Sequence, residues 1–304
     1  MNDIIRIGTR ESQLALWQAN TVKDLLQQYG HAAELVLIKS DGDTDLKTPL
    51  YEIGVQGIFT KALDIALLDG RIDIAVHSMK DVPTQMAKGI VQAAVLPRAS
   101  YLDILVPKKG DVFNASSATP SVIGTSSIRR KAQWLHRYPA DTIENLRGNV
   151  NTRLQKVEDS SWTGAIFAAA GLERIGLRPD NAVSLHWMLP APAQGAIIVV
   201  CRAGEEKILA ACANFHDEDT ALCTHIERDF LRVLLGGCST PISALARVEG
   251  ETVVFEGNIL SKDGSQKREI AKTISKAQAP GIGAMAATEL LQNGGREILE
   301  GILK

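Results

Sequence analysis

The apolar residues of this chain fall into short runs separated by stretches with helical spacing. Over roughly the first third of the chain, the short runs predict buried strands and the periodic stretches predict amphipathic helices. The predicted strands are Ile4–Ile7, Leu35–Ile38, Ile72–Val76 and Val91–Leu96, and the predicted helices are Leu14–Gln28 and Phe59–Leu68. Strands that alternate with helices indicate a mainly parallel sheet covered by helices.

A second series of the same kind follows. Ile7-Gly8-Thr9, which leads into a helix with Trp17, reappears as Ile123-Gly124-Thr125, which leads into a helix with Trp134. The strands of this series are Val122–Ile123, Thr142–Leu146 and Ala165–Ala170, and its helices are Ile128–His136 and Asn151–Glu158. The repeated strand-turn-helix context predicts two related α/β lobes.

Two proline-containing segments, Pro97–Val106 and Leu189–Gly195, interrupt the pattern and are candidate hinges. Because the apolar strand Ala196–Cys201 follows the second one, we expect the chain to return to the first lobe, as in a clamshell. The predicted boundaries are 1–97 and 196–214 for the first lobe and 105–190 for the second, with hinges near 98–104 and 190–195.

The pattern changes near the C-terminus to a helix, three strands and a final helix. This order predicts a smaller α+β domain over 218–304, with a hairpin turn at Asp263-Gly264. The predicted elements are the helices Ala221–Leu234 and Gly283–Gln292 and the strands Ala244–Glu249, Thr252–Leu260 and Arg268–Ile274. A chain of 304 residues is long enough for several domains.

Composition narrows the function classes. A formal net charge of -2 gives no global field for nucleic acid or anionic membranes, so any attraction for anions must be local. No apolar run approaches the length of a membrane span or a signal peptide, which predicts a cytoplasmic protein. The four cysteines show no Cys-x-x-Cys spacing, which argues against a disulfide framework and a zinc site.

Basic and hydroxyl side chains gather where the predicted strands end and helices begin. In open α/β sheets, ligands bind at this edge, and guanidinium groups and helix N-termini both bind carboxylate or phosphate. Each serine could instead cap a helix, and each arginine could be an ordinary surface residue. The repetition favours a small polyanionic ligand. The residues are Thr9, Arg10, Ser12, His77, Ser78, Lys80, Thr125, Ser126, Ser127, Arg129, Arg130, Arg147, Asn149, Arg153 and Arg174.

Two residues could carry chemistry. Asp81 is a carboxylate within this basic set, and the spacing alone fits an ion-pair partner of Lys80 or an arginine better than a general acid/base. Cys238 lies in the loop Gly236-Gly237-Cys238, where it could be an attachment point or an ordinary small apolar residue. His77, at the end of an apolar strand, fits a structural role better.

Seven ordered motifs, spread over nearly the whole chain, resemble the hydroxymethylbilane synthase (porphobilinogen deaminase) family. The motifs are Thr9–Gln18, Val76–Pro83, Gly124–Arg130, Leu146–Leu154, Ala170–Arg174, Gln194–Ala196 and Gly236–Cys238 with Pro241–Ile242. The resemblance implies two lobes like those of type II periplasmic binding proteins, with doubly wound sheets, and a third domain that carries the cysteine loop. It also implies a monomeric transferase without a metal.

The resemblance further implies a dipyrromethane cofactor, joined by a thioether to Cys238. Porphobilinogen would lose ammonia to form an azafulvene and add to this primer four times, before linear 1-hydroxymethylbilane is released. Asp81 would stabilise positive charge on pyrrole nitrogen and move protons. The residues implied to bind the acetate and propionate groups are Arg10, Ser12, Ser78, Lys80, Thr125, Ser126, Ser127, Arg129, Arg130, Arg147, Arg153, Arg174 and Gln194.

The segment around residues 40–59 resembles a lid loop, with Asp43, Gln56 and Phe59 as its candidate site residues. This chain has Gln56 where many family members carry lysine, and Asp41 where a basic or neutral residue is frequent. The main alternative function is a clamshell that captures an anionic metabolite without converting it. The predicted third domain with its Gly-Gly-Cys loop favours the enzyme.

Overall fold

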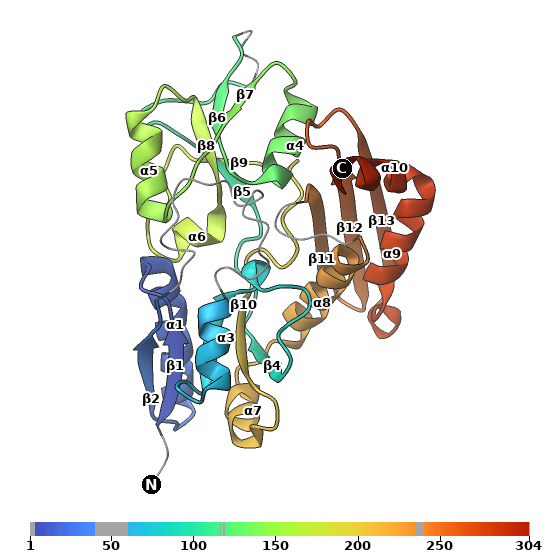
Figure 1. The fold of residues 1–304 in the computed structure, drawn as a ribbon. Coiled ribbons are helices and arrows are strands. Elements are labelled where there is room, and N and C mark those ends of the chain that lie inside the picture. Colours follow the sequence, from blue (N-terminus) through green and yellow to red (C-terminus); the bar gives the residue numbers. More distant parts are fainter. Residues whose placement is uncertain (1–3, 40–59, 116, 118, 235–239, 304) are drawn as a thin grey trace. The chain divides into compact units, whose positions relative to one another are not determined.

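The computed structural model describes residues 4–39, 60–115, 117, 119–234 and 240–303. These residues form two compact units, drawn in Figure 1. The first unit contains residues 4–39, 60–99 and 195–221, and the second contains residues 100–194 and 222–303. The chain therefore leaves the first unit near Ala99 and returns to it at Gly195.

The first unit is built on a 5-stranded sheet in the order β2-β1-β3-β10-β4. β1 pairs in parallel with β2 and β3, whereas β10 runs antiparallel to both β3 and β4. The strands are β1 (Ile5–Thr9), β2 (Ala33–Leu37), β3 (Ile74–Ser78), β4 (Ile90–Val95) and β10 (Ile197–Arg202), and the helices are α1 (Gln13–Gln28), α3 (Lys61–Leu68) and α7 (Glu206–Ala213).

The second unit contains a 5-stranded sheet in the order β7-β6-β8-β5-β9. β6 pairs in parallel with β7 and β8, whereas β5 runs antiparallel to β8 and β9. The strands are β5 (Asp103–Pro107), β6 (Val122–Gly124), β7 (Thr142–Glu144), β8 (Gly164–Ala168) and β9 (Val183–Ser184), and the helices are α4 (Ile128–Arg137), α5 (Val150–Asp159) and α6 (Ala169–Glu173).

The two sheets share one topology. In each, the second strand in the order pairs in parallel with its two neighbours, which follow it in the sequence, and the fourth strand in the order is antiparallel. That reversed strand, β10 in one sheet and β5 in the other, is the first strand after the chain crosses between the units. The α/β class with two doubly wound lobes is therefore correct, and the strands are mainly parallel as predicted.

The repeated Ile-Gly-Thr motif has a packing cause. A Cβ on Gly8 would lie 2.2 Å from Cδ1 of Ile72, and a Cβ on Gly124 would lie 2.5 Å from Cζ3 of Trp162. Contacts this short do not occur between real side chains, so a larger residue at either position would force the neighbouring side chains to move. The same constraint acts at equivalent places in both sheets.

The second unit also contains a 3-stranded antiparallel sheet in the order β11-β12-β13. Its core includes Phe230 and Phe255, whose ring centroids are 5.3 Å apart. The elements are α8 (Glu218–Val233), β11 (Ile242–Glu249), β12 (Thr252–Leu260), β13 (Lys267–Ser275), α9 (Ile282–Leu290) and α10 (Arg296–Leu303). The predicted Asp-Gly hairpin turn is present, with Gly264 at a φ of 75°.

Three differences from the predicted elements have local causes. Asp103 and Ile104, within the predicted hinge, begin the buried strand β5, because the polar Asp103 is paired inside the protein. The predicted strand Ala165–Ala170 stops at Ala168, where α6 begins. The predicted final helix stops early because Gly294 adopts a φ of 91°, and α10 follows it.

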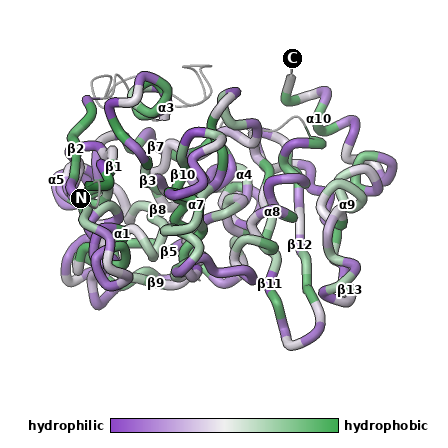
Figure 2. The backbone as a smooth tube through the Cα atoms, turned by 90° about the horizontal axis from the view of Figure 1, so that it is seen from below, coloured by the Kyte–Doolittle hydropathy of each residue, from purple (hydrophilic) through white to green (hydrophobic). Residues whose placement is uncertain are grey.

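Both α7 and α10 are absent from the predicted elements. α10 is short but amphipathic: Ile298, Leu299 and Ile302 are buried in the core that contains Phe230. Figure 2 shows this as an alternation of hydrophilic and hydrophobic colour along α10. No helix in the described part of the chain is long and apolar enough to cross a membrane.

The packing of α9 on α8 predicts the effect of one methyl group. A Cβ on Gly283 would lie 2.0 Å from the backbone oxygen of Ile226, so Gly283→Ala forces the two helices apart. We expect it to lower the free energy of unfolding by about 1–3 kcal/mol, measured by urea denaturation. Gly301→Ala in α10 is the matched control, because nothing lies within 4 Å of its Cβ. Alanine favours helix there, so equal effects of the two substitutions would contradict this packing.

Candidate active site

The carboxyl ends of β1 and β3 lie at one edge of the first sheet, because these neighbouring strands are parallel. Arg10 follows β1, and Ser12 caps α1 by accepting a hydrogen bond from the backbone N–H of Ala15. Ser78 ends β3 and accepts a 2.8 Å hydrogen bond from Nε2 of the buried Gln18. The structure thus brings Arg10, Ser12 and Ser78 to the same edge, with Gln18 fixing the Ser78 hydroxyl.

Asp81 lies in a 3₁₀ turn, Met79–Asp81, directly after β3. The turn ends at Val82, whose extended backbone is the conformation favoured before Pro83. Asp81 is half-buried, and its carboxylate has no hydrogen-bond or ion-pair partner among the residues that the structure describes. The ion pair considered for Asp81 is therefore not formed within this part of the chain.

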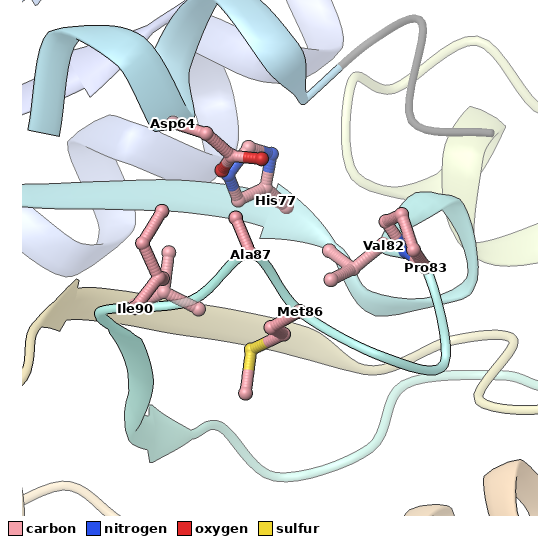
Figure 3. A pocket seen from close by; sticks show the side chains of 8 residues that line it. Asp64, His77, Val82, Pro83, Met86, Ala87 and Ile90 are labelled. Atoms are coloured by element: carbon pink, nitrogen blue, oxygen red, sulfur yellow. The ribbon is translucent and has the colours of Figure 1, made fainter. Parts of the chain in front are cut away.

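His77 precedes Ser78 and points to the opposite face of β3, as alternation along a strand requires. Burial, followed by the charge of Arg10, lowers the pKa of His77 to about 4. Its Nε2 has no hydrogen-bond partner among the described residues. Figure 3 shows the imidazole beside the carboxyl group of Asp64, in a small pocket with apolar side chains such as Val82 and Ile90. Burial also raises the pKa of Asp64.

Hydroxyl groups organise the corresponding edge of the second sheet. Ser126 Oγ donates to the backbone oxygen of Leu146 at 2.7 Å and accepts from its N–H at 2.9 Å. Thr125 Oγ1 accepts from the N–H of Ser127, whose own side chain caps α4. Ser126 and the backbone of Thr125 therefore hold the turn after β6 against β7 and the segment after it, and Ser127 caps α4.

Arg129 and Arg130, in the first turn of α4, both bind Asp103 at the start of β5. Nη1 of Arg129 lies 2.7 Å from Oδ2, and Nη2 of Arg130 lies 2.8 Å from Oδ1. Asp103 is fully buried, and the two arginines are 5% and 7% exposed. Burial alone would raise the pKa of Asp103, but the two guanidinium charges hold it well below its usual range. The aspartate therefore stays ionised.

Gln194 joins this cluster from the segment that precedes β10. Its Nε2 donates to Oδ1 of Asp103 at 3.0 Å and to the backbone oxygen of Tyr101 at 2.8 Å. Its neighbour Ala193 has a φ of 61°, which is rare for a residue other than glycine. The N–H of Ala193 donates to the buried carboxylate of Glu227 in α8 at 2.6 Å. Gln194 is thus part of a buried hydrogen-bonded chain.

Three further arginines follow β7 and β8. Arg147 is buried, and Arg153 in α5 donates from Nε to the backbone oxygen of Gly148 at 2.7 Å. Arg174 follows α6, and burial lowers its pKa to about 10. An anion that binds next to a buried guanidinium stabilises its charged form, which burial alone disfavours. Asn149, at the same edge, caps α5.

Some predicted site residues lie outside the residues that the structure describes. They are Cys238, the lid residues Asp43, Gln56 and Phe59, and Asp41. Conversely, sequence reasoning missed Asp103, Gln18 and Glu227. Asp103 carries a signal that could have found it: it is the acidic first residue of the apolar run Ile104–Val106, where a carboxylate needs a buried partner.

Together these features define a class of protein. It is an α/β protein whose two lobes share one topology and present guanidinium, hydroxyl and carboxylate groups at their strand ends, which suits a small ligand with several carboxylates. Among the described residues, no group of three or more His, Cys, Asp or Glu side chains is arranged to hold a metal ion.

The chain belongs to the porphobilinogen deaminase family. Residues 5–210 match the family model described as porphobilinogen deaminase, dipyromethane cofactor binding domain, and residues 221–292 match the model of the porphobilinogen deaminase C-terminal domain. The family predicted from the seven motifs is thus confirmed.

Curated relatives agree over nearly the full length. Porphobilinogen deaminase of Syntrophotalea carbinolica is 42% identical over 97% of this chain and 95% of its own, and that of Moorella thermoacetica is 42% identical over 97% and 96%. The chloroplastic porphobilinogen deaminase of Oryza sativa is 42% identical over 89% of this chain. A solved periplasmic binding protein of Salmonella typhimurium covers 72% of this chain at 10% identity, with a TM-score of 0.42. So distant a likeness says nothing about the ligand of this chain.

The buried His77 predicts how stability depends on pH. The folded chain keeps this imidazole neutral down to about pH 4, whereas the unfolded chain protonates it below its ordinary pKa of 6.5. The unfolded state therefore binds more protons between these values, and stability is lost as the pH falls from 6.5 to 4. We expect His77 to account for a loss on the order of 2 kcal/mol between pH 7 and pH 4.5.

Urea denaturation of His77→Gln at these two pH values measures this contribution. The variant should lose less stability on acidification than the parent chain, whatever its stability at pH 7. The exposed His186 supplies the control, and His186→Gln should keep the parent's pH dependence. If His77→Gln loses as much stability as the parent, the imidazole is not neutral in the folded chain.

Proposed function

We propose that this chain is a hydroxymethylbilane synthase: it removes ammonia from porphobilinogen, joins four units head to tail on a dipyrromethane held by Cys238, and releases linear 1-hydroxymethylbilane. Membership of the family over 5–210 and 221–292 supports this function. The structural observation that best supports this function is the state of Asp81. It is half-buried, and its carboxylate has no partner among the described residues although Lys80 is its neighbour in the sequence.

The side chains fit a group rich in carboxylates. Each pyrrole of porphobilinogen origin carries an acetate and a propionate, and the lobes supply guanidinium groups at their strand ends. Nε of Arg129 is buried without a hydrogen-bond partner among the described residues, and the pKa of Arg174 is lowered by burial. Both features favour an added anion. When bound, the dipyrromethane supplies the free pyrrole α-carbon to which new units are added.

The residues proposed to bind these carboxylates are the basic and polar side chains at the two strand-end edges. Arg10, Ser12, Ser78 and Lys80 lie in the first unit, and Thr125, Ser126, Ser127, Arg129, Arg130, Arg147, Arg153, Arg174 and Gln194 lie in the second. For Ser12, Ser126 and Ser127 the hydroxyl oxygen already accepts a backbone hydrogen bond, which leaves the O–H or a second lone pair for a ligand.

Asp81 is proposed to act on the pyrrole nitrogens. A pyrrole N–H gains positive charge when the ring expels ammonia, and also when the α-carbon of the ring attacks the azafulvene. An ionised carboxylate within hydrogen-bond distance stabilises that charge. The same carboxylate can accept and return a proton as the new ring regains aromaticity. Its position at the end of a short 3₁₀ turn, fixed by β3 and Pro83, holds the group in one place through successive cycles.

A clamshell that only captures an anionic metabolite would need the same guanidinium groups. It would need neither a partnerless carboxylate among those groups nor a covalent anchor on a separate loop. Three further proposals rest on the family and the sequence: a monomer in the cytoplasm that takes no nucleic acid or membrane partner, a lid formed around Asp43, Gln56 and Phe59, and a third domain over 218–304 that carries Cys238.

The mass of the purified chain tests the covalent anchor. We expect the intact mass to exceed the sequence mass by two condensed pyrrole units, and Cys238→Ser to remove this increment because serine cannot form the thioether. Cys212→Ala is the control, since Cys212 is a buried packing residue whose thiol pKa is raised by burial to about 12. An active chain of unmodified mass would exclude the proposed cofactor attachment.

Substitution of Asp81 tests the proton transfer. We expect Asp81→Asn to fold normally, because its carboxylate forms no hydrogen bond or ion pair with a described residue, and to lower kcat by at least about a hundredfold. The rate of hydroxymethylbilane formation and the circular dichroism spectrum measure both effects. Asp69→Asn, at an exposed aspartate after α3, should keep the parent rate. A near-normal rate for Asp81→Asn would remove this residue from the mechanism.

A further inference from the structure

We propose that Asp103, which carries no role in the chemistry described above, is the positioning residue that orients Arg129 and Arg130 toward the substrate or cofactor carboxylates; this inference rests on the proposed function. Arg129 and Arg130 are consecutive residues in the first turn of α4, and both have long side chains with several rotatable bonds. A single carboxylate on β5 draws both together.

Both carboxylate oxygens of Asp103 are bound by other side chains of the protein, and the residue is buried. Oδ1 accepts from Nε and Nη2 of Arg130 at 3.0 and 2.8 Å and from Gln194 at 3.0 Å, while Oδ2 accepts from Arg129 at 2.7 Å. The residue is 0% exposed. It therefore cannot bind substrate or exchange protons with it, and it acts only through the side chains that it holds.

Arg130 is held at all three guanidinium nitrogens. Nε and Nη2 bind Asp103, and Nη1 donates to the backbone oxygen of Ile166 in β8 at 2.9 Å. Among the described residues, Arg129 is bound through Nη1, which donates to Asp103 and to the backbone oxygen of Leu189. Its Nε is buried with no hydrogen-bond partner in this part of the chain. Asp103 thus fixes one edge of the Arg129 guanidinium, and the remaining N–H groups are left for an anion.

The charges explain why such an anchor is useful. Two arginines and one aspartate leave one positive charge in excess, and a buried charge without a counter-ion is costly. A ligand carboxylate removes that cost. A guanidinium binds a carboxylate best when both planes are aligned, so an arginine that is already oriented loses less side-chain entropy on binding.

The cluster also connects the anchor to the segment through which the chain leaves the second unit. Gln194 binds Asp103, the preceding residue Ala193 has a rare backbone conformation, and Glu227 accepts a hydrogen bond from the N–H of Ala193. Glu227 accepts from Ala246 of β11 at 2.7 Å as well. These contacts fix the position of Asp103 and make it a rigid support for the arginines.

Charge and orientation make opposite predictions for Asp103→Asn. If charge alone governed binding, the loss of the aspartate charge would make the site more positive and lower the KM for porphobilinogen. If orientation governs binding, as we propose, the arginines lose their fixed geometry and KM rises. Asp103→Glu distinguishes charge from orientation further. It keeps the charge but displaces the carboxylate by one methylene at a fully buried position.

The experiment compares both variants with the parent, using full-length chains purified from cells. Intact mass gives the fraction that carries the cofactor, and kcat is expressed per loaded chain. We expect KM to rise about tenfold in both variants, or the cofactor to be absent from a chain whose near-ultraviolet circular dichroism matches the parent. A KM that falls, or that rises less than threefold with full loading, overturns the proposal. If Asp103→Asn does not fold, Asp103→Glu decides.

Asp73→Asn is the matched control. Asp73 also joins two arginines, lying 2.7 Å from Nη2 of Arg6 and 3.6 Å from Nη2 of Arg202, but it precedes β3 at the opposite end from Ser78. Its substitution removes a more exposed cluster of one aspartate and two arginines and lowers stability, yet KM and cofactor loading should stay within twofold of the parent. A tenfold rise in KM in this control as well would reduce the effect of Asp103 to general destabilisation and overturn the proposal.

One measurement is independent of the enzymatic activity. In a chain labelled with ¹⁵N-arginine, the Nε–H of Arg130, assigned by its loss in Arg130→Lys, should exchange slowly with water because it is buried and bound to Asp103. Asp103→Asn should speed this exchange at least tenfold. Unchanged exchange would overturn the anchor even in an active enzyme, whereas faster exchange in a chain that does not convert porphobilinogen would indicate that only the proposed function is wrong.

Discussion

The ion cluster of Asp103 with Arg129 and Arg130 is the interaction on which the second unit depends most. It joins the first strand after the crossing, β5, to the first helix of the lobe, α4, and all three side chains are buried. Removal of one partner from such a cluster leaves a buried charge unpaired, which typically costs about 3–5 kcal/mol. The same residues also place a positive charge at the strand ends. The proposed ligand binding would therefore use the same residues as the packing of β5 against α4.

A second constraint is the close packing at Gly8 and Gly124, which makes the strand-to-helix turns of the two sheets alike. In both sheets the parallel strands bring the turns after the first and third strands to one edge, so the functional groups there come from segments far apart in the sequence. The first unit contains the carboxylate of Asp81, which has no partner among the described residues, and the second contains a cluster of buried guanidinium groups.

Sequence reasoning came closest where local pattern and local chemistry coincide. The strand-turn-helix units around Gly8 and Gly124, the hairpin at Gly264 and the caps at Ser12 and Ser127 all follow from apolar spacing and turn residues. It failed at Asp103, which was assigned to a hinge. A carboxylate is buried only when partners offset the cost of its desolvation, and the partners of Asp103 are distant in the sequence. The two arginines that offset this cost lie 26 and 27 positions away. Likewise α10 was missed because its apolar face is too short to stand out without the core that it covers.

The sequence by itself determined the family, the α/β class with two related lobes, and the set of basic and acidic residues from which a site is built, because these depend on motifs and on periodic patterns along the chain. Only the tertiary structure decided how those residues are paired. It left Asp81 without a partner among the described residues and placed Gln194 in hydrogen-bond contact with Asp103. It also bound Arg130 through three nitrogens and Arg129 through Nη1. The reason is that a side chain's charge is local, whereas its partners, burial and orientation are set by strands and helices that meet only in the fold.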